Sequence, residues 1–274
     1  DIDNTDFMGS RYQFSQGGAA ASVINQGTIT VDENGFVVLA ATGVANEGKI
    51  LARMGTVALG SGERFSIDFS GDGLVRFAVD GSVLSQVTTL DGTPLPVAVS
   101  NTGTITATGG HVVMTAWGST KIFSSVINQS GIIQANSMVN RGGVIELLAS
   151  DSGTVVNSGT LDASGIDTGA APGSITLAGQ SVVHSGMIVA RGGALGGDVG
   201  AIEISGKETF SISGTIDAGA PYGENGTILL DPMFIVVKTA GGTITPAQID
   251  AFGGNIALRA DTDITFTDPV TITT

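Results

Sequence analysis

Cysteine is absent from this chain, and charged residues make up only 13% of its 274 positions. Without cysteine there can be no disulfide, no thiolate zinc site and no cysteine nucleophile. Basic residues are scarce as well: 11 Lys and Arg stand against 25 Asp and Glu, a formal net charge of −14. Such a chain repels polyanions, so we expect no nucleic acid partner.

Long hydrophobic runs are also missing. The most apolar stretch, residues 228–237, is interrupted by Asp231 and Pro232, whereas a membrane-spanning helix needs about 20 apolar residues in succession. We therefore expect no membrane span. The chain begins at Asp1 without an initiator Met or an apolar leader, which predicts a processed product or a piece of something longer.

Glycine and aliphatic residues are what the chain has instead. It contains 42 glycines, and 42% of its residues are hydrophobic although only 5% are aromatic. This apolar content is enough to offset the entropy of ordering the chain, so we expect it to fold. The shortage of aromatic rings predicts a thin core.

A short motif recurs along the sequence. It contains a β-branched residue, an Asn, a Gly two or three positions later, and then a small residue followed by Ile or Leu. The recurring Asn residues are Asn25, Asn46, Asn101, Asn128 and Asn157, and the marker glycines are Gly27, Gly48, Gly103, Gly131, Gly159, Gly186 and Gly214. Successive marker glycines are 21, 55, 28, 28, 27 and 28 residues apart. Regular spacing of this kind indicates the coil of a solenoid.

Short runs within each period alternate apolar with small or polar residues, for example residues 35–40, 55–59 and 173–177. Such alternation predicts strands with one buried face, and no helical pattern separates them. We therefore predict an all-β fold, a right-handed parallel β-helix with coils of about 21–28 residues. The Asn and Gly residues should form its turns, with the Asn side chains stacked as a ladder and His184 in an Asn position.

Two segments depart from the repeat. Residues 65–69 and 75–79 alternate on either side of a turn, which predicts an antiparallel hairpin over residues 62–82, packed on the side of the helix. This excursion explains the 55-residue interval between marker glycines. Near the end, Thr245 as cap, Pro246 at the first position and Gly253 as terminator predict one short helix.

Several of these segments resemble the filamentous haemagglutinin family of two-partner secretion exoproteins. Residues 1–8, 11–14, 25–30, 44–48, 55–60 and 68–79 resemble the later part of the family's secretion domain, and residues 158–165 and 226–232 resemble the β-helical shaft that follows it. The family's Asn-Pro-Asn-Gly secretion motif is missing, so this piece alone is not expected to be secreted.

The resemblance implies three segments. Residues 1–100 would be the C-terminal part of the secretion domain with its hairpin, residues 101–232 the shaft, and residues 233–274 a short helix and strands that lead into a further coil. It also implies export through a dedicated outer-membrane transporter to the bacterial cell surface. The implied role is adhesion, biofilm cohesion or, in toxin-bearing relatives, contact-dependent inhibition.

Candidate ligand sites are few. Asp68, Ser70 and Asp72 resemble the start of a calcium loop, but Val79 replaces the bidentate Glu, which favours a simple turn. His111 stands alone, so no histidine pair has metal-ligand spacing. Loops about one coil apart would stack into a ledge suited to weak glycan binding or, alternatively, be solvated turns; the ledge residues are Asp167, Arg191, Asp198, Tyr222 and Glu224.

These observations favour a non-enzymatic segment of a surface adhesin, which gives reach and presents a binding surface to glycans or a receptor protein. We expect no catalytic residue and no cofactor. The alternatives are a polysaccharide lyase or hydrolase on the same scaffold, and an export module that acts with the transporter.

Overall fold

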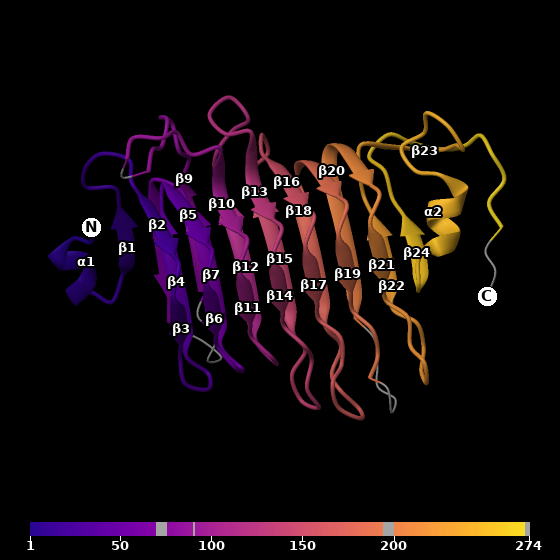
Figure 1. The fold of residues 1–274 in the computed structure, drawn as a ribbon, viewed down its shortest axis with the longest axis horizontal. Coiled ribbons are helices and arrows are strands. Elements are labelled where there is room, and N and C mark those ends of the chain that lie inside the picture. Colours follow the sequence, from indigo (N-terminus) through magenta and orange to yellow (C-terminus); the bar gives the residue numbers. More distant parts are fainter. Residues whose placement is uncertain (70–75, 90, 194–199, 272–274) are drawn as a thin grey trace.

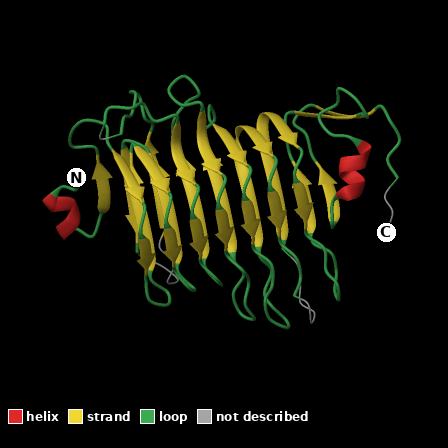
Figure 2. Ribbon diagram, viewed as in Figure 1, coloured by secondary structure: helices red, strands yellow, loops and turns green. Residues whose placement is uncertain are grey.

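The computed structural model describes residues 1–69, 76–89, 91–193 and 200–271. Almost all of its regular structure is β-strand, and the strands stack along one long axis (Figures 1 and 2). The chain winds around this axis in coils, and a regular coil contributes one strand to each of three faces. The parallel β-helix expected from the glycine spacing is confirmed.

Each face is a set of parallel strands, one coil apart. The first face contains β4 (Phe36–Ala41), β7 (Thr56–Ser61), β12 (His111–Ala116), β15 (Val144–Ala149), the first parts of β18 (Ser174–His184) and β20 (Ala201–Ile212), β22 (Thr227–Leu230) and β24 (Asn255–Leu258). The second face contains β2 (Ser22–Asn25), β5 (Gly43–Asn46), β10 (Val97–Asn101), β13 (Ser125–Gln129), β16 (Thr154–Asn157) and the later parts of β18 and β20. The third face contains β3 (Thr28–Thr30), β6 (Lys49–Leu51), β11 (Thr104–Thr106), β14 (Ile132–Gln134), β17 (Thr160–Asp162), β19 (Met187–Val189) and β21 (Thr215–Asp217).

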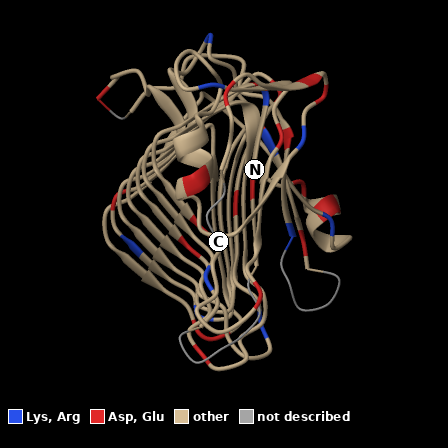
Figure 3. Ribbon diagram, turned by 90° about the vertical axis from the view of Figure 1, so that its right-hand side faces the viewer, with Lys and Arg blue, Asp and Glu red and all other residues tan. Residues whose placement is uncertain are grey.

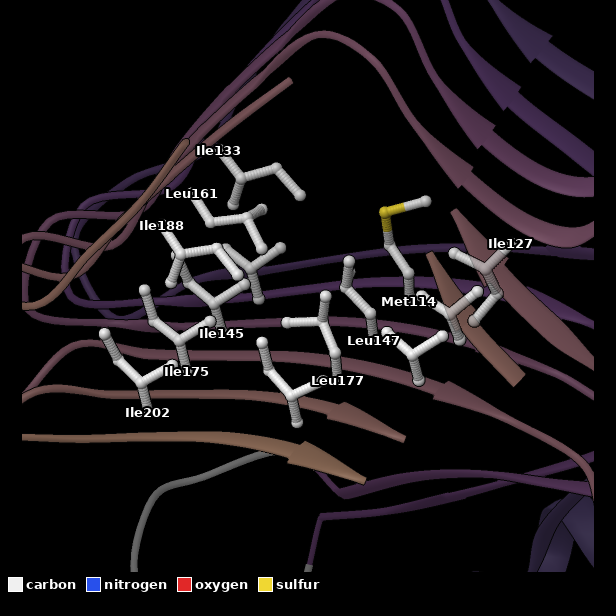
Figure 4. Close-up of a cluster of buried hydrophobic side chains, with 14 of the residues drawn as sticks. Met114, Ile127, Ile133, Ile145, Leu147, Leu161, Ile175, Leu177, Ile188 and Ile202 are labelled. Atoms are coloured by element: carbon white, nitrogen blue, oxygen red, sulfur yellow. The ribbon is translucent and has the colours of Figure 1, made fainter. Parts of the chain in front are cut away.

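The core is a set of aliphatic columns that run along the axis. In-register pairing puts Ile133 beside Leu161, and Leu161 beside Ile188, all fully buried. These side chains of the third face point toward Ile145 and Ile175 of the first face (Figure 4). Branched aliphatic residues fill most of the space between the faces, and Phe123 is the one ring among the largest fully buried side chains. Figure 3 shows that the charged residues are few and scattered along the ribbon, and no Lys, Arg, Asp or Glu is among the described buried residues.

Residues 62–96 leave the helix, as the long interval between marker glycines predicts. Strands β5, β6 and β7 pair directly with β10, β11 and β12, so no coil is missing between them. Within the excursion, β8 (Arg64–Asp68) and β9 (Arg76–Gly81) form the expected antiparallel hairpin. The hairpin packs on the first face, where a Cβ on Gly60 would lie 2.2 Å from the Phe77 ring.

The hairpin is joined by a strand from the start of the chain that the sequence did not predict. β1 (Tyr12–Ser15) pairs antiparallel with β8 and extends the hairpin to three strands. The short helix α1 (Asn4–Met8), capped by Asp3, precedes it and was not predicted either.

The C-terminal end combines a helix with two further strands. Helix α2 (Pro246–Ala251) has the expected cap, since Thr245 and Gln248 form a reciprocal capping box. β23 (Phe234–Val237) pairs in parallel with β25 (Asp263–Phe266), 29 residues later. One buried cluster runs from Val37 to Phe252 through the stack. The segment limits at residues 100 and 232 stay predictions.

Candidate functional site

A ladder of buried amides follows the corner between the second and third faces. The side-chain Nδ2 of Asn25 donates to Oδ1 of Asn46, and Nδ2 of Asn46 donates to Oδ1 of Asn101; each bond is 2.7 Å long. Asn46 and Asn101 have no exposed surface. Each amide thus satisfies a buried neighbour, which is the condition for keeping polar groups inside a β-stack. The role of these residues in the structure is packing and register.

In the fourth coil the ladder residue is Gln129 and not the predicted Asn128. Asn101 donates to Oε1 of Gln129 at 2.7 Å, whereas Asn128 pairs in register with Ser100 and Val156. The prediction for Asn128 was wrong because Gly131 is three residues beyond it. In the other coils the ladder residue is two residues before the glycine, and here that residue is Gln129. The extra residue places Asn128 on the outer side of β13.

At Gln129 the hydrogen bonding of the ladder changes from side chain–side chain to side chain–backbone. The Gln129 Nε2 donates to the backbone carbonyls of Gly131 and Thr160, at 2.9 and 3.3 Å, so Oδ1 of buried Asn157 has no partner among the described residues. Asn157 Nδ2 lies 3.1 Å from Nδ1 of His184, and His184 Nε2 lies 3.2 Å from the Thr215 carbonyl. Because a carbonyl only accepts and an amide NH2 only donates, His184 must carry its proton on Nε2.

Burial lowers the pKa of His184 below its ordinary value near 6.5, so its neutral form is stabilised. The fully buried ring is therefore part of the ladder and a poor candidate for a proton donor. The ladder ends one coil later, where Ile212 stands opposite His184.

The marker glycines form a second column at the same corner. A Cβ on Gly131 would lie 2.1 Å from the carbonyl oxygen of Gly103, and the same oxygen contact recurs at 2.0 to 2.3 Å for Gly48, Gly103, Gly159, Gly186 and Gly214. None of these glycines has a positive φ. Close approach of the coil below, rather than a left-handed backbone, therefore requires glycine.

His111 is paired, which the sequence did not indicate. Its Nε2 lies 2.7 Å from Oε2 of Glu146 on the outer side of the first face. The hydrogen bond from His111 lowers the pKa of Glu146. A general acid for glycoside cleavage needs a raised pKa, so this carboxylate is unsuited to that role. The pair was missed because 35 residues separate its members, more than one regular coil.

The predicted ledge follows the lower edge in Figure 1, where the third face turns into the first. The bases of these loops stack, since Gly165 N donates to Arg191 O at 2.9 Å and Gly192 N to Gly219 O at 3.2 Å. Tyr222 is 73% exposed at the tip of its loop. The Arg191 side chain is 3.4 Å from Asp217, and Asp167 and Glu224 are exposed. Asp198 lies outside the described residues, and glycan binding by this ledge stays a prediction.

Of the three residues that resemble a calcium loop, the structure describes only Asp68. Asp68 ends β8, while Ser70 and Asp72 lie outside the described residues. In the described part of the chain, no three His, Cys, Asp or Glu residues come together in a way that could hold a metal ion. No described helix is long and apolar enough to cross a membrane.

The comparison with solved structures gives the fold a counterpart. Three solved chains match, among them the crystal structure of the HMW1 secretion domain from Haemophilus influenzae, with a TM-score of 0.60. The chain has the fold of a secretion domain. The likeness covers 97% of this chain and 72% of the HMW1 chain, at 19% sequence identity.

The match agrees with the resemblance seen in the sequence, and at this identity it concerns the fold alone. It extends over the coils after residue 100 as well as those before it. No family model and no curated protein matches the chain.

Proposed function

We propose that this chain is a non-catalytic, β-helical part of the secretion domain of a two-partner adhesin, exported through a dedicated outer-membrane transporter. The observation that carries the proposal is the secretion-domain fold along 97% of the chain. The stack also suits export as an extended chain. Each coil offers a complete hydrogen-bonding edge to the next, so folding can proceed coil by coil as the chain emerges. No disulfide has to form on the way, since cysteine is absent.

The export role can be tested in the bacterium that makes the protein. Deleting residues 22–101 in frame from the full parent chain removes the first coils, and we expect the extracellular protein to be lost. An immunoblot of the periplasm in a protease-deficient strain separates failed export from degradation. Extracellular protein at the unaltered level would overturn the proposal.

Adhesion is the further role that we propose for the folded rod. Its length gives reach, and its loops stand out along the lower edge in Figure 1. Tyr222, which is 73% exposed, offers a ring to a sugar, and the carboxylate of Glu224 in the same loop offers an acceptor for its hydroxyls. Equal binding of the parent and a Tyr222→Ala variant on a glycan array would remove this ledge from consideration.

A further inference from the structure

A groove opens on the opposite edge of the stack, where the first face turns into the second. Its cavity measures about 800 Å³ and is lined by residues 82–84, 117–119, 121–122 and 149–152. These segments lie along the upper edge in Figure 1. In the next two coils the same corner is closed, because β18 and β20 run through it as continuous strands. The groove therefore exists only where the corner loops of two coils are long.

Backbone and side-chain bonds hold the three walls together. Val83 is buried, and its N–H donates to the Trp117 carbonyl at 2.7 Å, which fixes the chain after β9 against the helix. The hydroxyls of Ser150 and Ser152 donate to the Gly118 carbonyl at 2.7 and 3.4 Å. The loop of one coil is thus tied to the loop of the next, and the groove is preformed.

Trp117 is the aromatic residue in the lining of this groove. It is the one tryptophan of the chain, and 43% of its surface is exposed directly after the buried end of β12. No ring of another described aromatic residue packs against its indole. Leu84, 77% exposed, stands on the neighbouring wall. A large ring left open to water in a preformed groove is typical of a ligand site.

The polar side chains around Trp117 are mostly hydroxyls, together with one cation, Lys121, and one anion, Asp151. Ser82 and Ser119 make no side-chain hydrogen bond within the described structure, and Lys121 makes no ion pair there. Asp151 is 2.5 Å from Lys207. The net charge of −14 for the whole chain disfavours an anionic ligand.

We propose that the groove binds an uncharged oligosaccharide, with one sugar ring stacked on Trp117 and sugar hydroxyls bonded to Ser82, Ser119 and Lys121. A sugar ring has an apolar C–H face and a hydroxyl rim, which match the indole and the surrounding serines. A second hollow of about 420 Å³ adjoins the first at Ser82 and Leu84. Two connected hollows suit a chain of several sugars rather than a monosaccharide.

This site deepens the adhesive role proposed above and is separate from the Tyr222 ledge at the opposite edge. Its test uses the purified chain and does not involve export. Failure of sugar binding would leave the export proposal standing, and failure of export would leave the groove standing.

The single tryptophan makes the measurement direct. Cellohexaose, maltohexaose, mannohexaose and chitohexaose are titrated into the protein while tryptophan emission is recorded. We expect at least one of them to give a saturable spectral shift. By calorimetry, Trp117→Ala should weaken that binding at least about tenfold, because truncation of a central aromatic contact commonly costs this much. Phe266→Ala, which alters an exposed ring at the far C-terminal end, is the matched control and should bind as the parent does.

Three results would overturn the proposal. They are no saturable response to any of the four sugars at tens of millimolar, undiminished binding by a Trp117→Ala variant with the parent's circular dichroism, and a response to a casein peptide digest without a response to sugars. A variant that failed to fold would be replaced by Ser119→Trp, which fills the groove from its rim and should also abolish binding.

Discussion

At the scale of single residues, two columns line the corner between the second and third faces, one of glycines and one of amide side chains. The two columns tolerate different substitutions. The glycine column has no free space, since each glycine lies on the carbonyl of the glycine below. The amide column accepts Asn, Gln and His, because each can continue a chain of hydrogen bonds. The sequence therefore varies at the ladder and keeps glycine beside it.

Gly131→Ala should destabilise the protein strongly. Its Cβ would lie 2.1 Å from a backbone oxygen that other hydrogen bonds hold in place, and overpacking of this kind costs about 1–3 kcal/mol or more. Gly18→Ala is the control, because a Cβ there meets nothing within 4 Å. Urea denaturation followed by circular dichroism measures both. Equal midpoints for the two variants would show that the coils can separate at little cost.

Acid should weaken the protein through His184. Burial lowers the pKa of this histidine from about 6.5, so the unfolded chain binds a proton more readily than the folded chain does. The stability due to the neutral ring is complete above pH 6.5 and is lost as the pH falls through the lower, folded-state pKa. Each unit of pKa difference corresponds to about 1.4 kcal/mol.

His184→Asn should remove part of this acid sensitivity, since Asn supplies both an acceptor and a donor at that rung. The check is the change in melting temperature between pH 7.5 and pH 5, which should be smaller in the variant. His111→Asn alters a partly exposed histidine and is the comparison. If acid lowered the melting temperature of His184→Asn as much as that of the parent, groups other than His184 would be the cause.

At the scale of elements, each short strand works by the alternation of its side chains. On β14, Ile132 is 43% exposed while the next residue, Ile133, is fully buried between the Ile105 and Leu161 rungs. Two neighbouring isoleucines therefore have opposite roles.

Ile133→Ala should cost about 2–5 kcal/mol, because it leaves a cavity in the column. Ile132→Ala should change the free energy of unfolding by no more than about 0.5 kcal/mol, as is usual for surface sites. The pair is compared by equilibrium denaturation. Similar losses for both variants would contradict the assignment of inner and outer positions.

At the scale of the whole molecule, stability comes from contacts between neighbouring coils while the net charge opposes compactness. The formal charge of −14 is balanced by few ion pairs, and those seen are mostly exposed. Exposed pairs contribute little. Repulsion among the carboxylates should therefore dominate the salt response.

Raising NaCl from about 20 mM to 0.5 M should increase the melting temperature, because the Debye length falls to a few ångströms and screens this repulsion. Differential scanning calorimetry at both concentrations measures the effect. A fall in melting temperature would indicate that ion pairs, such as Lys207–Asp151, outweigh the repulsion.

Much of the architecture could be predicted from the sequence because a solenoid repeats one local rule. Alternation set the inward and outward sides of the strands, glycine spacing set the coil length, and the Thr245 cap located α2. The hairpin was visible for the same reason, as alternation on both sides of a turn. These are local features, which the order of residues specifies directly.

Other features depend on contacts between distant segments, and only the tertiary structure decided them. The pairing of β1 with β8, the seat of Phe77 on Gly60, the His111–Glu146 pair and the shift from Asn128 to Gln129 follow from how coils of unequal length are aligned. The Trp117 groove has the same origin, since its walls come from residues about 35 positions apart on each side. By itself, the sequence determined the coil; the stacking of coils determined which side chains meet.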